Sequence, residues 1–321
     1  MIFRKATLIV RVVFFCALLA PPLLRADETA RPDGLVPVTF AFYNLRNYLT
    51  MERRIKGEIV ADAPKPENEI KAVIEGLVAI RPDILGVCEI GDATQIADLQ
   101  SRLKAAGIDL PHTEMVTDSA GWNRNLALFS RFPIIGRYSR DDYTYDLAGT
   151  KHAFQRGVLD VKLAINPQYH LRYIGLHLKS KREVPEGDET LMRLNEARLA
   201  REHLDRILEE EPGANLLVAG DFNDIRIEPP IKTLQGGFGG GGYLRALGLS
   251  DEEGFTWTHY WSFADVYSRF DYALYSEGLG SELNRDLCRI HHWKNWEKAS
   301  DHRPLVISFT PVDKAAAPQR K

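Results

Sequence analysis

The chain has 321 residues, of which 45% are hydrophobic and 26% are charged, and its formal net charge is −3. This length suffices for one large domain or two, and because the composition shows no linker-like shift we expect one. The slight acidity argues against nonspecific clamping of duplex nucleic acid, which needs a basic face, but it allows a nuclease with a local basic rim.

The first 26 residues have the pattern of a secretory signal peptide. Residues 4–11 carry three basic side chains and no acid, an apolar run follows over residues 12–20, and Ala26 offers a cleavage site before Asp27. The apolar run is short for a membrane span, and an uncleaved anchor is the alternative. We therefore expect export to the periplasm or the extracellular space. Cleavage would remove four basic residues and leave a mature chain of net charge −7.

Two of the three cysteines, Cys88 and Cys288, lie beyond this segment. An exported protein could pair them, but their spacing cannot establish a disulfide, and we favour two buried free thiols. The Cys and His spacing of a zinc site is absent from the sequence.

The first part of the mature chain alternates strands and helices. Residues 36–44 alternate and are rich in β-branched and aromatic side chains, which predicts a strand. Apolar residues at helical spacing predict a helix over residues 67–80, followed by a buried strand over residues 84–89. A second helix is predicted over residues 93–106, ended by Gly107.

The remainder is richer in strands. We predict strands over residues 126–129, 158–165, 171–178, 215–220, 270–275 and 305–309, with a long amphipathic helix over residues 190–210. Such a mixture predicts an α/β (α+β) fold in which two stacked mixed β-sheets are flanked by helices, a four-layer sandwich over residues 27–310. The glycine-rich residues 236–242 lack the lysine of a phosphate-binding loop and are interpreted as a flexible loop. Residues 311–321 are interpreted as a disordered tail.

Polar residues recur where the predicted strands end, which is where catalytic groups are commonly placed. They are Asn44, Glu89, His177, Asp221 with Asn223, Asp271, and Asp301 with His302. Taken singly, each has an ordinary structural explanation, as a loop residue, a cap or a satisfied core histidine.

Taken together, the order Asn, Glu, His, Asp-x-Asn, Asp, Asp-His resembles the endonuclease/exonuclease/phosphatase superfamily. The resemblance covers residues 40–309, and its most specific parts are Gly-Asp-Phe-Asn at 220–223 and Ser-Asp-His-Arg-Pro at 300–304. It implies a metal-dependent phosphoester hydrolase. Relatives of that superfamily include deoxyribonucleases, abasic-site endonucleases, neutral sphingomyelinases and inositol-phosphate 5-phosphatases.

The resemblance also implies roles for the metal-side residues. Hard oxygen ligands suit Mg²⁺ or Mn²⁺, with Glu89 the first choice as ligand and Asn44 and Asp301 in support. Asp221 is the candidate to orient or deprotonate the attacking water, and Asn223 to donate a hydrogen bond to a phosphate oxygen.

On the phosphate side, His302 is expected to contact the scissile phosphate while Asp271 orients its imidazole and keeps it cationic. His177 matches a second histidine of the deoxyribonuclease-like and sphingomyelinase-like branches, which abasic-site endonucleases lack. The acid that pairs with this histidine in deoxyribonucleases is replaced here by Asn125 or Arg124, which favours a phosphate contact for His177.

Asn125 is also a candidate for substrate binding, and three further side chains join it. Arg156 and Lys179 could add local positive charge. Trp257 could stack on a base, although packing explains it as readily.

The preferred hypothesis is an exported endonuclease that acts on nucleic acid as a monomer, without a protein partner and without stable membrane association. A phosphomonoesterase or a lipid-headgroup hydrolase is the alternative, but a sphingomyelinase needs an exposed aromatic or apolar hairpin and we expect none. A catalytically inactive binding module should have lost a central residue, and the sequence retains them all.

Overall fold

The computed structural model describes residues 36–240 and 242–313. The predicted signal peptide lies outside these residues, as does the predicted tail from residue 314 onward. Within the described part of the chain, no helix is both long and apolar enough to cross a membrane. The described end of the predicted tail is hydrogen-bonded to the body: Asn166 donates to the Pro311 carbonyl at 3.0 Å, and Asn215 donates to the Asp313 carboxylate at 2.8 Å.

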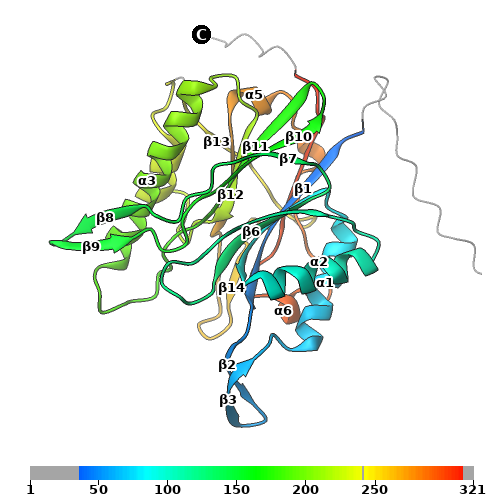
Figure 1. The fold of residues 1–321 in the computed structure, drawn as a ribbon, viewed down its shortest axis with the longest axis vertical. Coiled ribbons are helices and arrows are strands. Elements are labelled where there is room, and N and C mark those ends of the chain that lie inside the picture. Colours follow the sequence, from blue (N-terminus) through cyan, green and yellow to red (C-terminus); the bar gives the residue numbers. More distant parts are fainter. Residues whose placement is uncertain (1–35, 241, 314–321) are drawn as a thin grey trace, which may run out of the picture. The chain divides into compact units, whose positions relative to one another are not determined.

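Two six-stranded mixed sheets form the centre (Figure 1). The first contains, in spatial order, β17 (Arg289–Ile290), β18 (Leu305–Phe309), β1 (Val38–Tyr48), β4 (Ile84–Ile90), β6 (Asn125–Ser130) and β5 (His112–Val116). The second contains β13 (Arg245–Ala246), β16 (Asp271–Tyr275), β12 (Leu216–Asp221), β11 (Tyr169–His177), β10 (Leu159–Asn166) and β7 (Ile134–Arg137). One parallel pair lies inside each sheet, β1 with β4 and β11 with β12.

The core lies between the sheets, where Phe40 and Phe42 of β1 share one apolar cluster with Leu171 and Tyr173 of β11. The other face of the first sheet packs with α1 (Glu67–Ile80) and α2 (Ala93–Ala105). The other face of the second sheet packs with α3 (Glu189–Glu210) and α4 (Pro229–Gln235). Because the central strands are covered on both faces, they are apolar throughout rather than alternating. The predicted four-layer fold class is confirmed.

Several short elements were not predicted. They include three two-stranded hairpins, β2–β3 (Met51–Ile55, Glu58–Ala63), β8–β9 (Thr144–Leu147, Thr150–Ala153) and β14–β15 (His259–Trp261, Val266–Ser268), and the short helices α5 (Glu277–Gly280), η1 (Arg285–Leu287) and α6 (Trp296–Ala299). Their strands are short and largely exposed, so the hydrophobic alternation that reveals a strand is weak in them.

The glycine-rich segment follows α4 as a loop, as far as it is described. Gly236 has a φ of +79°, and a Cβ there would lie 2.7 Å from the guanidinium of Arg201, so this position requires glycine. Phe238 in the same loop is 92% exposed. Both remaining cysteines are free, with Cys88 buried and Cys288 half-buried.

Candidate active site

The sheet register brings three of the predicted polar residues into one row. Asp221 ends β12, and its register partners are His177 on the parallel strand β11 and Asp271 on the antiparallel strand β16. His302 lies just before β18 of the other sheet. These four residues, which face one another at this edge, are therefore up to 125 positions apart in the sequence, from His177 to His302.

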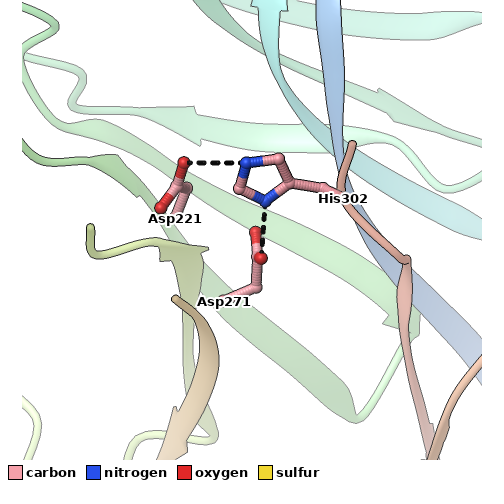
Figure 2. Close-up of side chains that lie close together, drawn as sticks. All are labelled: Asp221, Asp271 and His302. Carbon is pink, nitrogen blue, oxygen red and sulfur yellow. Dashed lines mark hydrogen bonds and ion pairs between the residues drawn. The ribbon is translucent and has the colours of Figure 1, made fainter. Parts of the chain in front are cut away.

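His302 lies between two buried carboxylates (Figure 2). Its Nδ1 is 2.7 Å from Oδ2 of Asp271, and its Nε2 is 3.7 Å from Oδ2 of Asp221. Burial by itself would lower the pKa of His302, but the charges of Asp271 and Asp221 outweigh it and raise the pKa to about 10. The imidazole is thus held as a cation at neutral pH.

For Asp221, the effect of burial on the pKa outweighs the effect of the neighbouring charges. Burial raises the pKa of its carboxyl well above the usual range, although the charge of His302 and the backbone N–H of Asn223 both favour the ionised form. A carboxylate that is both fixed and made more basic in this way suits the acceptance of a proton from water.

Glu89 and Asn44 approach Asp221 from the first sheet. The amide Nδ2 of Asn44 donates to Oδ2 of Asp221 at 3.0 Å and lies 3.4 Å from Oε1 of Glu89, while Oδ1 of Asn44 accepts from the backbone of Arg46. Glu89 has a φ of +59°, and the pairing of β4 with both of its neighbours shifts around it. A bulge of this kind turns a side chain away from the regular alternation, and backbone strain of this kind is typical of functional sites.

Asn223 and Asp301 complete the predicted set. Asn223 has a φ of +51°, donates its backbone N–H to Asp221, and donates its side-chain amide to the Leu178 carbonyl at 3.0 Å. Asp301 is partly exposed, and its Oδ2 is 3.6 Å from Nε of Arg46. Ser300, which we did not predict as a site residue, donates to the Asn44 carbonyl at 2.8 Å and accepts from the His302 backbone, so it joins β1 to the segment that carries His302 within the first sheet.

His177 and Arg156 form the other side of the site. Nε2 of His177 is 3.7 Å from Oδ2 of Asp221, and burial and the charge of Arg156 hold the pKa of His177 well below its usual range. Among the described residues, Nδ1 of His177 and both Nε and Nη1 of Arg156 are buried without a hydrogen-bond partner. A buried guanidinium with free donors favours an anionic ligand, because leaving such donors unpaired is costly.

Asn125 and Lys179 are directed elsewhere. Oδ1 of Asn125 accepts from the backbone of Asp118 at 2.8 Å, and its Nδ2 donates to the Gly91 carbonyl at 3.0 Å. Nζ of Lys179 donates to the Ser180 and Arg182 carbonyls at 3.1 and 2.9 Å. The structure therefore gives both side chains loop-fixing contacts and does not bring them to the row at Asp221.

Trp257 is enclosed by other side chains. The guanidinium of Arg303 lies 3.3 Å from its ring centroid, and the rings of Tyr267 and Trp296 pack at 4.8 and 5.1 Å. Packing, the second of the two explanations given for Trp257, accounts for it. Its role is to support β14–β15 and the segment that carries His302.

The β14–β15 hairpin is the part of the site region that the sequence interpretation missed. His259 forms an isolated bridge with His302, and the two rings are 4.7 Å apart. Further out, Trp261 is 54% exposed and Phe263 is 90% exposed. The expectation that no aromatic hairpin is exposed is therefore wrong. The run of three aromatic residues at positions 260, 261 and 263 was the available signal.

The available ligands fit a hard divalent cation. Glu89, Asp221 and Asp301 provide carboxylate oxygens, the donors that Mg²⁺ and Mn²⁺ prefer. Ligand atoms of Asp221, Asp271 and His302 also lie within 4.8 Å of one another. Within that second group His302 is already bonded to Asp271, whereas Glu89 is only partly buried, so the residues that could hold a cation are those on the Glu89 side. Asn44 turns its amide nitrogen to the carboxylates, which makes it a bridge between them rather than an oxygen donor.

Comparison with known proteins agrees with this geometry. The Endonuclease/Exonuclease/phosphatase family model matches residues 41–302, and the chain belongs to this family, whose enzymes are metal-dependent phosphoester hydrolases. The predicted resemblance is confirmed. No curated protein sequence matches the chain.

Solved structures with the same fold include proteins of different descriptions. Truncated TDP2 of Caenorhabditis elegans is 15% identical, with 85% of this chain and 98% of that chain covered and a TM-score of 0.57. Sphingomyelinase C of Streptomyces griseocarneus is 14% identical, with 85% and 99% covered and a TM-score of 0.59. The human nocturnin catalytic domain, solved with a bound sulfate anion, is 19% identical, with 85% and 94% covered and a TM-score of 0.55. At these identities the likeness establishes the fold alone.

Proposed function

We propose that the chain is an exported, divalent-metal-dependent phosphodiesterase that hydrolyses phosphodiester bonds of nucleic acid. The observation that carries this proposal is the buried row in which His302 lies between Asp221 and Asp271, with the unpaired donors of Arg156 and His177 beside it. The row combines a basic carboxylate, a fixed cation and free hydrogen-bond donors, which are the groups that hydrolysis of an anionic ester requires.

Each side chain takes one role. Asp221 orients the attacking water and accepts its proton, because burial makes its carboxylate more basic. The imidazolium of His302 donates to a phosphate oxygen and is held in orientation by Asp271. His177, which burial keeps neutral, contacts the phosphate as a hydrogen-bond donor rather than as an acid. The guanidinium of Arg156 offsets the negative charge of the phosphate.

Glu89, with Asp301, would hold the divalent cation. The cation supplies charge neutralisation at the phosphate when it is bound. Asn44 keeps Glu89 and Asp221 at a fixed separation through its amide hydrogens, so that the metal side and the water side stay aligned.

The test is a screen of the purified protein on single-stranded and plasmid DNA, RNA, bis(p-nitrophenyl) phosphate, sphingomyelin and inositol phosphates, each with Mg²⁺, Mn²⁺ or Ca²⁺. The His302→Ala variant serves as the blank. Hydrolysis of the diesters that His302→Ala abolishes supports the proposal. Absence of hydrolysis of every substrate with every cation, together with no binding of Mn²⁺ by calorimetry, refutes it.

Hydrolysis of a lipid headgroup is the second candidate, because the exposed Trp261 and Phe263 form the kind of hairpin that such an enzyme needs. The same screen separates the two functions. Cleavage of sphingomyelin without cleavage of either nucleic acid would replace the first proposal with the second.

Export through the N-terminal segment is tested separately. Expression of the full chain with a C-terminal tag should yield a mature form that begins near Asp27, identified by N-terminal sequencing. Recovery of a chain that still carries residues 1–26 from the membrane fraction would favour the uncleaved anchor.

A further inference from the structure

The β14–β15 hairpin presents three aromatic rings to solvent beside the site, those of Trp261, Phe263 and, on the opposite face, the 52% exposed Tyr267. Trp261 and Phe263 are 54% and 90% exposed, and their ring centroids are 6.1 Å apart with an interplanar angle of 30°. Exposed aromatic side chains that gather on one short element mark interaction surfaces, because water is a poor environment for them.

The opposite face of the hairpin is anchored. Tyr260 stacks on Tyr267 at 4.4 Å, and Tyr267 packs against Trp257 at 4.8 Å. Trp257 in turn packs against Trp296 of α6. A two-stranded hairpin is marginal by itself, and this aromatic contact with the body fixes it. The exposed rings are therefore presented on a rigid support, which reduces the ordering cost of binding.

The hairpin also has a fixed position relative to the reaction. His259 is bridged to His302 with a ring separation of 4.7 Å, and the side chains of residues i and i+2 of a strand point to the same face. Trp261 is thus on the face of His259, about 7 Å farther along the strand. A flat group attached next to the phosphate that His302 contacts would lie beside this ring.

The distribution of charge favours one class of ligand. The hairpin from His259 to Ser268 contains one acid, Asp265, and no lysine or arginine, so it offers no attraction to an anionic surface. The partly exposed cations Arg46 and Lys181 lie next to acids of the site segments instead, Arg46 at 3.6 Å from Asp301 and Lys181 at 2.6 Å from Asp224, with their side chains 49% and 45% exposed. A ligand that fits both features has negative charges at its backbone and uncharged flat rings to the side, which describes a single-stranded nucleic acid.

We propose that Trp261, with Phe263, is a stacking platform for a nucleobase that flanks the scissile phosphate, and that the substrate is single-stranded at this position. This proposal rests on the proposed phosphodiesterase function. A base paired within a duplex is stacked between its neighbours and cannot offer its face to the hairpin, so the platform selects unpaired strands.

Binding is measured by fluorescence anisotropy in a His302→Ala background, which prevents cleavage during the measurement. The probes are an octathymidylate and an abasic backbone of the same length. Adding Trp261→Ala should weaken octathymidylate binding about tenfold to hundredfold, the range for the loss of one base stack. Trp261→Phe should retain most of the affinity. The abasic strand should bind weakly both to the His302→Ala protein and to the variant that also carries Trp261→Ala.

The control is Phe238→Ala, which removes an even more exposed aromatic ring, 92% against 54% for Trp261, from the loop after α4 and should leave octathymidylate binding unchanged. Sedimentation with vesicles of phosphatidylcholine and sphingomyelin tests the alternative that the hairpin binds a membrane. If Trp261→Ala reduces sedimentation with vesicles but leaves octathymidylate binding intact, the hairpin is a membrane element and the proposal is overturned.

Two further outcomes also overturn it: equal affinity of the thymidylate and abasic strands, or no binding of either. Turnover of bis(p-nitrophenyl) phosphate by the protein with His302 intact is measured in parallel. If the protein turns over this diester but binds the thymidylate and abasic strands equally well, the stacking platform is rejected while the phosphodiesterase function stands. The absence of turnover would reject the function itself.

Discussion

Replacement of Asp271 by Asn tests the electrostatic core of the site. The substitution preserves the shape of the side chain but removes the charge 2.7 Å from Nδ1 of His302. At an effective dielectric constant of about 20, Coulomb's law gives roughly 6 kcal/mol for unit charges at this distance, or about 4 pKa units. The pKa of His302, raised to about 10 in the wild type, should therefore fall to about 6.

The consequence is a pH-dependent loss of activity. At pH 8 the imidazole of the variant would be about 1% protonated, so kcat should fall about a hundredfold. At pH 5.5 most of the imidazole is protonated in both proteins, and the loss should be much smaller. The measurement is the ratio of wild-type to variant kcat for bis(p-nitrophenyl) phosphate between pH 5.5 and 8.

The loss of stability in Asp271→Asn should have the opposite pH dependence and be largest at low pH. Because the folded-state pKa of His302 is raised, its stabilising contribution is complete below about pH 6.5 and is lost as the pH rises toward 10. Urea denaturation should therefore show a larger destabilisation of Asp271→Asn at pH 6 than at pH 9.5.

Asp160→Asn is the control, because Asp160 is also buried and also lies 2.7 Å from a histidine, His203. It should reduce stability while leaving the kcat ratio flat with pH. A ratio for Asp271→Asn that stays within a few fold and does not change with pH would refute the assignment of a cationic His302.

Three further predictions concern single side chains. Asp221→Asn should reduce kcat at least a hundredfold with little change in KM; a loss of only a few fold would remove Asp221 from the role of base. Glu89→Gln should weaken Mn²⁺ binding in calorimetry about tenfold or more, with activity partly recovered at high Mn²⁺, and an unchanged affinity would place the cation elsewhere. Burial raises the pKa of Glu196 to about 7, so the folded state binds this proton more tightly and stability should fall by up to about 3 kcal/mol between pH 4.5 and 7. Urea denaturation should show a smaller slope over that range in Glu196→Gln, and an equal slope would contradict the burial argument.

The strands, helices and most of the central polar set could be predicted because their signals are local. The stripe of apolar residues in α1 and the glycine after α2 determined both helices within one residue of their observed ends. Asn44, Glu89, Asp221 and His302 were recognisable because each follows or precedes an apolar strand in a fixed order. The sequence therefore determined the four layers and which residues converge at one edge.

Other assignments depended on which atoms face one another, and only the tertiary structure decided them. Asn125 and Lys179 have the residue types of substrate contacts, but their donors and acceptors are engaged by backbone groups. Trp257 has the position of a stacking ring, yet Arg303 and Tyr267 pack against it and the exposed ring is Trp261 instead. Composition and order along the chain specify which groups are present near a site. The direction of each side chain depends on contacts between segments distant in sequence, and these form only when the two sheets pack.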